Sequence, residues 1–342
     1  MQATRVVIPE KRKCEIQTFQ VGKPGSGELL MQTQCSLISP GTEMSFYAGH
    51  HSRLQRKDQP ANSWASYPFY PGYSLGGIVQ EVGQGCTLKP GQKVMAHHPH
   101  VSACCLEQGR VTVVPDTVSL EDACFLELAA ISLNGVRRAD VRLGDAVVVM
   151  GAGLVGLLAI SLAQIDGASK IIVLDPDEER QKLAMQYGAT HAFNPLNQAS
   201  DQAIKDLTDG WGADVVIEAS GNINAIVMGL GLTRQCGRMV LLGCQHGEIM
   251  FSFYEGIQSR SITVIGAHIN SSPNTAQTGV FHQTKQRDFQ LILEMILKEQ
   301  LKVSQWISHR ITPSEIAQMY DAIDKRSCST LGIIVNWQDG KS

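Results

Sequence analysis

Three glycines, Gly151, Gly153 and Gly156, form the sequence pattern with the clearest chemical meaning. They follow the apolar run AVVVM and precede a helical stretch. At such a junction the first glycine allows a tight turn, the second lets the backbone approach a pyrophosphate, and the third lets the helix pack closely on the strand. The pattern therefore predicts a dinucleotide-binding loop formed by Gly151, Gly153, Leu154, Val155 and Gly156.

Asp175 strengthens this prediction because it ends the next apolar run, KIIVLD. A carboxylate about 20 residues after the glycine loop accepts hydrogen bonds from the adenosine ribose. It also repels a 2′-phosphate, so Asp175 favours NAD(H) over NADP(H). Arg180 follows closely and could flank the adenosine, and a guanidinium there leaves NADP as the alternative cofactor.

The elements around this loop change character along the chain. Residues 1–120 alternate short β-rich runs with Gly and Pro turns, which predicts a mostly β unit. From residue 121, strands and helices alternate strictly, as is typical of a parallel sheet covered on both faces. We expect the helices at 154–166, 177–187, 199–209 and 222–233, and two more helices and a strand, TLGIIVNW, after residue 270. The predicted fold class is α/β, with a β unit interrupted by a doubly wound parallel sheet.

The composition limits the classes of function. With 342 residues the chain is long enough for about two domains. A net charge of −3 provides no basic surface for nucleic acid. No apolar stretch reaches the roughly 18 residues of a membrane span, and the amino terminus has no apolar core of a signal peptide. We therefore expect a cytoplasmic protein without nucleic-acid or membrane partners, whose nine scattered cysteines are thiols.

Several linked motifs resemble, in type and order, those of the medium-chain dehydrogenase/reductases, the zinc-type alcohol dehydrogenase-like superfamily. They are GYSLGGIVQEVG, KPGQKVMA, LNGVRRADVRLGDAVVVMGAGLVG, GADVVIEASG and GRMVLLG. The resemblance implies a GroES-like β domain at 1–121, a Rossmann NAD-binding domain at 122–268 and a return to the catalytic domain at 269–342. It also implies further contacts to the dinucleotide and its nicotinamide end from Ser220, Gly221, Leu242, Gly243, Ala267 and Ile269.

The zinc ligands of this superfamily do not carry over. In LISPGTE, Pro40 stands where relatives have the first zinc-binding cysteine, and Tyr73 and Ser74 stand where they have a His-Glu pair. The four-cysteine structural zinc loop is absent after KPGQKVMA. A catalytic zinc needs about three protein ligands, so we expect no metal. The chain resembles a zinc-lacking branch that includes bacteriochlorophyllide a dehydrogenase and sugar- or inositol-type dehydrogenases.

Without a metal, other groups must take the proton of an alcohol. By the resemblance, Thr42 occupies a hydroxyl position that bonds the substrate oxygen, and the alternative is a turn-capping threonine. Tyr73 replaces a ligand that faces the cleft, where a phenol with a depressed pKa could exchange a proton; the alternative is wall packing. Glu127, in FLELAAISLNG, could be a base, anchor a substrate hydroxyl or pair with an arginine. Glu43 matches a family aspartate with a structural role.

The run MAHHPHVS contains a histidine cluster, His97, His98 and His100. Three histidines so close together suggest either a metal site with Glu127 or a substrate-facing acid or base. Because successive side chains of a strand point to opposite faces, only His98 and His100 are expected to share a face. These two are the histidines that we take as catalytic candidates.

Together these features predict a zinc-independent, NAD(H)-dependent oxidoreductase that interconverts a secondary alcohol and a ketone. The polar candidate residues favour a small sugar- or polyol-like substrate. The alternative enzyme is an enoyl or quinone reductase, which more often uses NADPH, and the alternative of another class is a non-catalytic nucleotide-binding protein. The resemblance also implies a homodimer or homotetramer, often formed through the edge strand SITVIGA.

Overall fold

The computed structural model describes residues 1–56, 63–197, 199–271, 284–325 and 330–338. The chain forms two compact units. Unit 1 comprises Met1–Glu127 and Phe289–Ser342, and unit 2 comprises Leu128–Asp288. The two units divide within the helices α3 (Leu126–Ala139) and α8 (Lys285–Leu297). The domain boundaries after residues 121 and 268 that we expect from the sequence stay predictions.

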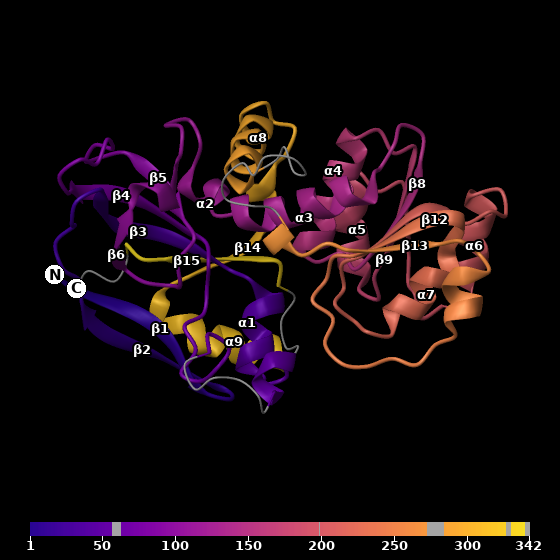
Figure 1. Ribbon diagram of the computed structural model, residues 1–342, viewed down its shortest axis with the longest axis horizontal. Coiled ribbons are helices and arrows are strands. Elements are labelled where there is room, and N and C mark those ends of the chain that lie inside the picture. Colours follow the sequence, from indigo (N-terminus) through magenta and orange to yellow (C-terminus); the bar gives the residue numbers. More distant parts are fainter. Residues whose placement is uncertain (57–62, 198, 272–283, 326–329, 339–342) are drawn as a thin grey trace. The chain divides into compact units, whose positions relative to one another are not determined.

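Unit 1 contains a seven-stranded sheet and a separate two-stranded sheet. The large sheet runs in the order β14-β15-β3-β4-β5-β7, with β6 also paired to β3, and only β14 and β15 are parallel. Its strands are β3 (Glu28–Ile38), β4 (Leu75–Val82), β5 (Lys93–Ala96), β6 (Ala103–Glu107), β7 (Val111–Val113), β14 (Ile307–Ile311) and β15 (Gly332–Asn336). The small sheet pairs β1 (Gln2–Glu10) with β2 (Lys13–Gln20). Figure 1 shows the late strand β15 beside β3, so the end of the chain completes the sheet of unit 1.

A helix that the sequence patterns do not predict follows β3. This helix, α1 (Pro40–Tyr47), starts with Pro40 at its first position, where the fixed φ of proline favours a helix start. Its last four residues, 44–47, are buried. The stretch LISPGTE therefore contains the end of β3, at Ile38, and the beginning of α1, at Pro40. Unit 1 also contains α2 (Leu120–Ala123) and α9 (Ile316–Asp324).

Unit 2 is the doubly wound parallel-sheet unit that the sequence predicts. Its six strands are all parallel and run in the order β10-β9-β8-β11-β12-β13. They are β8 (Ala146–Met150), β9 (Lys170–Leu174), β10 (His191–Phe193), β11 (Ala213–Glu218), β12 (Thr233–Leu241) and β13 (Thr263–Gly266). The helices are α4 (Leu154–Ile165), α5 (Glu178–Gln186), α6 (Ala199–Leu207) and α7 (Ala225–Leu232).

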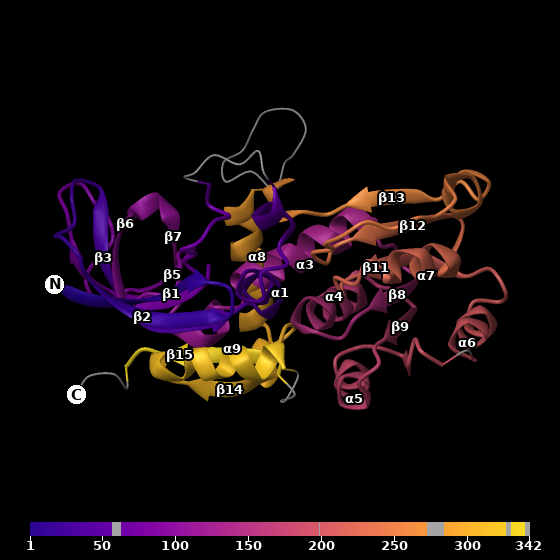
Figure 2. The ribbon, with the colours of Figure 1, turned by 90° about the horizontal axis from the view of Figure 1, so that it is seen from below.

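The apolar strands of unit 2 form its core. Every residue of β8 is buried, as expected for a strand with helices on both faces of its sheet. Helix α4 packs on β8 and β9, and α7 packs on β11 and β12 (Figure 2). The strand order reverses between β8 and β11, so the carboxyl ends of these two strands mark the point where such sheets bind ligands.

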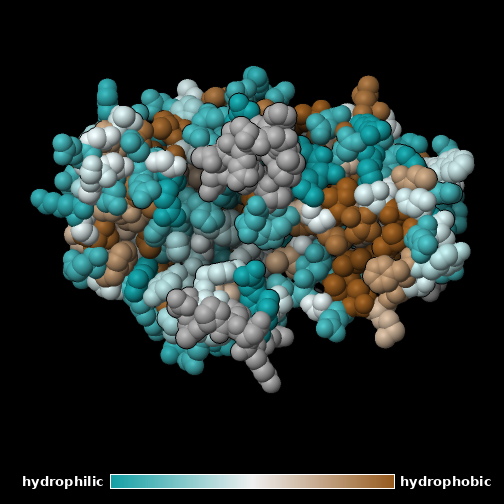
Figure 3. Space-filling model, viewed as in Figure 1, coloured by the Kyte–Doolittle hydropathy of each residue, from teal (hydrophilic) through white to brown (hydrophobic). Residues whose placement is uncertain are grey.

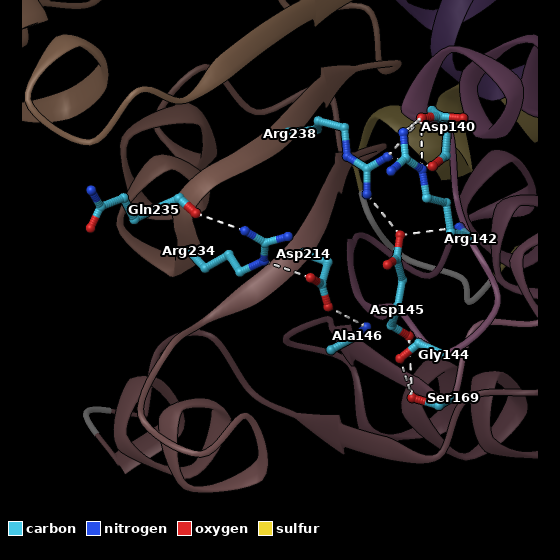
Figure 4. A network of polar contacts seen from close by, with 10 residues as sticks. All are labelled: Asp140, Arg142, Gly144, Asp145, Ala146, Ser169, Asp214, Arg234, Gln235 and Arg238. Atoms are coloured by element: carbon cyan, nitrogen blue, oxygen red, sulfur yellow. Dashed lines mark hydrogen bonds and ion pairs between the residues drawn. The ribbon is translucent and has the colours of Figure 1, made fainter.

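A polar network ties together the opposite, amino-terminal ends of the same strands (Figure 4). Arg234 of β12 donates to Asp214 of β11 at 2.6 Å, and Asp214 accepts the backbone N–H of Ala146 of β8 at 2.8 Å. Arg238 of β12 donates to Asp145 at 2.7 Å. These contacts join neighbouring strands at the end away from the glycine loop, so we assign them to the stability of the sheet.

Candidate functional site

The glycine loop follows β8 and has the geometry that a pyrophosphate requires. Gly151 has φ +95°, and a Cβ there would lie 2.8 Å from the Cα of Ser220. A Cβ on Gly156 would lie 1.8 Å from the carbonyl oxygen of Gly151. A Cβ on Gly153, by contrast, would meet no atom within 4 Å. The first and third glycines are therefore required by the protein itself, whereas the space at Gly153 is open to a ligand.

Helix α4 begins at Leu154, directly after this open position. The first N–H groups of a helix have no partner within the helix, and they attract anions together with the positive end of the helix dipole. The carbonyl of Val155 accepts the hydroxyl of Ser132 at 2.9 Å, which fixes the first turn. The residues present therefore fit a dinucleotide whose pyrophosphate lies at the start of α4.

Asp175 lies directly after β9 and is 5% exposed. One oxygen accepts the backbone N–H of Ala152 at 2.7 Å, and the other accepts that of Asp177 at 2.9 Å. The carboxylate therefore holds the glycine loop, a task that the sequence pattern does not reveal. Each carboxylate oxygen accepts more than one hydrogen bond, so a ribose hydroxyl can still bind. Arg180 lies in the first turn of α5, where its N–H donates to Asp177 at 3.2 Å.

Sequence reasoning missed Glu218, the last residue of β11. This side chain is fully buried and accepts the backbone N–H of Ser220 at 2.8 Å and that of Gly221 at 3.4 Å. The Ser220 hydroxyl and the Gln245 amide also donate to it. Burial raises the pKa of Glu218 although these hydrogen bonds oppose the shift. Glu218 thus holds the loop at Ser220 and Gly221, and its one sequence signal is an acid that ends a continuous apolar strand, ADVVIE.

The remaining cofactor candidates surround the same strand end. The N–H groups of Leu242 and Gly243 donate to the backbone carbonyl of Glu218 at 2.9 and 2.7 Å. Ala267 is buried and donates to the carbonyl of Leu241 at 3.0 Å, and a short helix begins at Ile269. All of these residues belong to unit 2, although a role for any of them in binding cofactor stays a prediction.

In unit 1, a chain of hydroxyl groups connects α1 with the PGYS stretch. The phenol of Tyr73 donates to the hydroxyl of Ser39 at 2.5 Å. Burial raises the pKa of Tyr73, against the opposing effects of hydrogen bonds with the side chains of Ser39 and Thr42, and nearby Glu43 and Glu127 raise it further. The depressed pKa that would let this phenol take a proton back does not arise, because removal from water penalises its anion. Tyr73 is a hydrogen-bond donor at neutral pH.

His97 and Glu127 form a pair next to Tyr73. The Nδ1 atom of His97 lies 2.9 Å from a carboxylate oxygen of Glu127. The Glu127 side chain is 2% exposed and the His97 side chain 54%. The imidazole also stacks on the Tyr73 ring, with the ring centroids 5.7 Å apart and an angle of 19° between the rings.

The other two histidines lie in different surroundings, for a reason that the sequence hides. Strand β5 ends at Ala96, so the alternation that paired His98 with His100 does not apply to residues 97–100. His100 is fully buried between the Ser36 hydroxyl, at 2.8 Å, and Glu43, at 3.1 Å. His98 is in contact with the carbonyl of Pro99 at 2.9 Å, and burial lowers its pKa. The histidine that joins Tyr73 and Glu127 is thus the one left out of the sequence-based choice.

The superfamily's zinc does not fit this group of residues. Ser39, Pro40, Tyr73 and Ser74 offer no thiolate or imidazole, and His97 with Glu127 provides only two ligands. Within the parts of the chain that the structure describes, no three His, Cys, Asp or Glu side chains come together as a metal site. A tetrahedral zinc site takes about three protein ligands and an open position. No step of the chemistry below is therefore assigned to zinc.

Comparison with known proteins shows which dehydrogenases the chain resembles. The family model described as zinc-binding dehydrogenase matches residues 155–306. Erythritol/L-threitol dehydrogenase of Mycolicibacterium smegmatis is 33% identical over 206 residues, which are 56% of this chain and 57% of that protein. L-threonine 3-dehydrogenase of Pyrococcus furiosus is 29% identical over 286 residues, 74% of this chain and 78% of that one.

A solved structure extends the match over the whole fold. That of 2R,3R-butanediol dehydrogenase from Bacillus subtilis aligns with a TM-score of 0.80 at 19% identity, covering 98% of this chain and 99% of the other. Each of the two chains combines a GroES-like unit with a Rossmann unit. By these matches the chain is similar to the zinc-type alcohol dehydrogenase-like oxidoreductases, the medium-chain dehydrogenase/reductases.

The edge of the unit 2 sheet carries an apolar surface. Figure 3 shows it as a brown area where Figure 1 places β13 and α7. Exposed side chains on these elements and on the segment between β12 and β13 are Val227, Met250, Phe253, Tyr254 and Val264. The homodimer or homotetramer implied by the family resemblance stays a prediction.

None of the helices in the described residues has the length and apolar character needed to cross a membrane.

Proposed function

We propose that the protein is a zinc-independent, NAD(H)-dependent oxidoreductase that interconverts a secondary alcohol and a ketone. The observation that carries the proposal is the group formed by Ser39, Thr42, Tyr73, His97 and Glu127. By the family resemblance Tyr73 stands where relatives have a zinc ligand. The group offers hydroxyl, imidazole and carboxylate groups in mutual contact. Such groups exchange protons and hydrogen-bond a carbonyl oxygen without a metal.

The roles divide according to what each group can do. When bound, NAD supplies the acceptor for the hydride that leaves the alcohol carbon. The raised pKa of Tyr73 keeps its phenol protonated, so its O–H, which donates to Ser39 when no substrate is bound, can turn to the carbonyl oxygen of a ketone. Ser39 and Thr42 orient that phenol through their hydroxyl groups.

We further propose NAD rather than NADP as the cofactor. Support comes from Asp175, whose buried carboxylate is fixed beside the glycine loop by two backbone N–H groups. A 2′-phosphate near a fixed carboxylate would be repelled. Arg180 lies in the first turn of α5, and its positive charge would instead attract a 2′-phosphate and so favour NADP.

A sugar- or polyol-like substrate is the class that these residues favour. The half-exposed imidazole of His97 and the phenol of Tyr73 would hydrogen-bond to oxygen atoms of such a substrate, which an apolar substrate does not offer. The relatives that act on erythritol, L-threitol and L-threonine, by their names, are consistent with a small polar substrate.

The test is an assay of NADH and NADPH oxidation with ketones, enones and quinones, together with metal analysis of the same sample. We expect turnover with polar ketones, at least about tenfold better with NADH, and no loss of activity in a chelator. Stoichiometric zinc lost together with activity would contradict the metal-free mechanism. Turnover with enones alone would assign the protein to the enoyl reductases, and inactivity throughout would favour a non-catalytic role.

Tyr73→Phe removes the phenol hydroxyl and keeps the ring that stacks on His97. We expect kcat to fall about 10- to 100-fold, the range for loss of one positioned proton donor. The free energy of unfolding should change little, because the substitution removes only the hydrogen bond between Tyr73 and the hydroxyl of Ser39. Tyr254→Phe is the matched control, because the Tyr254 side chain belongs to unit 2 and is 61% exposed. If the kcat of Tyr73→Phe equalled that of the wild type, the Tyr73 hydroxyl would not be a proton donor in the reaction, and the side chain would serve in packing alone.

A further inference from the structure

We propose that His97 is the catalytic base that takes the alcohol proton, with Glu127 as its positioning residue. The inference rests on the proposed function and names the group that completes its proton path. Its basis is geometric: a half-exposed imidazole is held at Nδ1 by a buried carboxylate, 2.9 Å away, and stacks on the ring of Tyr73.

A base other than Tyr73 is required in the oxidation direction. The phenol already donates to Ser39. Because burial raises its pKa, the phenol is protonated at neutral pH and there is no phenolate to accept a proton. Hydroxyl groups such as those of Ser39 and Thr42 pass a proton on but do not hold it. The ring next to Tyr73 is that of His97, and imidazole is the side chain whose charge changes most readily near neutral pH.

The two other histidines of the run do not meet the same requirements. His100 is fully buried, with Ser36 and Glu43 at its two ring nitrogens, so a substrate does not reach it. His98 is in contact with the backbone carbonyl of Pro99, and no carboxylate contact of its ring is recorded among the described residues. His97 combines access to solvent with a carboxylate that orients it.

Glu127 acts through His97 and not on the substrate. It stands in the first turn of α3, where the helix dipole stabilises a negative charge, and its side chain is only 2% exposed. Accepting a hydrogen bond from Nδ1 places the imidazole proton there and puts the ring's lone pair on Nε2. The carboxylate then stabilises the positive charge that the ring gains with a second proton.

The proposed step oxidises the alcohol by removing one proton and one hydride. The O–H bond of the alcohol breaks, and its proton goes to Nε2 of His97. The electron pair of that bond becomes the second carbon–oxygen bond of the ketone. When NAD is bound, its nicotinamide would accept the hydrogen of the alcohol carbon together with the electron pair of that C–H bond. The imidazolium then returns its proton to solvent, which its half-exposed side chain permits.

The first test compares His97→Gln, Glu127→Gln and the matched control His309→Gln. His309 is a partly buried histidine of unit 1 that contacts its neighbour Ser308 at 2.9 Å. We expect kcat for alcohol oxidation to fall about 100- to 1000-fold in His97→Gln and about 10-fold in Glu127→Gln, with KM within about threefold of the wild type. Added imidazole should restore part of the activity of His97→Ala, and His309→Gln should equal the wild type.

The second test uses the cofactor-free protein and needs no turnover. Nitrogen–proton correlation spectra of the imidazoles, with the His97 signal assigned by its loss in His97→Gln, report which ring nitrogen carries the proton. We expect Nδ1–H for His97 in the wild type and in Glu127→Gln, and Nε2–H in Glu127→Leu. If the contact between Glu127 and His97 were purely structural, Glu127→Leu would shift the tautomer of His97 but leave kcat unchanged.

The outcomes separate this inference from the proposed function. Normal alcohol oxidation by His97→Gln, or an Nε2–H tautomer of His97 in the wild type, would overturn the assignment of the base and leave the oxidoreductase function intact. No turnover by the wild type with any alcohol or ketone would refute the proposed function itself.

Discussion

Gly156→Ala is expected to abolish dinucleotide binding and to destabilise unit 2. The new Cβ would lie 1.8 Å from the carbonyl oxygen of Gly151, so the backbone of the loop or the whole of α4 must shift. We expect the free energy of unfolding to fall by about 3 kcal/mol, the upper range for overpacking a core. NADH affinity, measured by nucleotide fluorescence, should fall at least about 100-fold because the loop no longer presents its N–H groups to the pyrophosphate.

Gly153→Ala is the matched variant, because its Cβ meets no protein atom within 4 Å and its φ of −74° suits alanine. Urea unfolding of this variant should match the wild type, whereas its NADH affinity should fall at least about tenfold. The pair thus distinguishes a glycine required by packing from one required by the ligand. Equal NADH affinity in Gly153→Ala and the wild type would mean that the dinucleotide does not approach this position.

The parallel-sheet unit could be predicted from the sequence because its signals are local. The strands β8 and β9 are apolar runs, AVVVM and IIVL, and each is followed by a helix. The glycine loop depends on three residues within one turn, so its pattern already contains the geometry. Helix ends differ by only a few residues from those expected, as for α7, which begins at Ala225 rather than at 222.

The candidate catalytic group could not be predicted to the same extent, because it depends on contacts distant in sequence. His97 and Glu127 are 30 residues apart, and their contact follows from the end of β5 at Ala96 and the start of α3 at Leu126. The strand rule that selected His98 and His100 assumed that β5 continued. Similarly, a Ser-Pro-Gly stretch resembles a turn, and only the buried residues after it make α1 a helix.

The same limit applies to Glu43, which the sequence suggests as structural without showing its partners. Its side chain is fully buried, accepts the backbone N–H of Ser39 at 2.7 Å and lies 3.1 Å from Nε2 of His100. The phenol of Tyr320 also donates to it. Glu43 thereby joins the start of α1 to α9 and to the histidine run. Because Ser39 accepts the hydrogen bond of Tyr73, this carboxylate also supports the proposed donor.

Glu43→Ala is therefore expected to lower the free energy of unfolding by about 3 to 5 kcal/mol, since it leaves three buried donors without their acceptor. Glu43→Gln, which keeps the shape and one acceptor oxygen, should lose about half of that and remain folded well enough for assay. Its kcat should fall with its stability because Ser39 is less firmly held.

Urea unfolding measures the loss, and Glu10→Ala is the control. Glu10 pairs with Lys13 on the surface, where both side chains are more than half exposed, so its removal should cost at most about 1 kcal/mol. If Glu43→Ala proved no more harmful than Glu10→Ala, the buried network around His100 would not hold α1, and the position of Ser39 beneath Tyr73 would need another cause. A stability loss in Glu43→Gln without any change in kcat would separate the network from the chemistry.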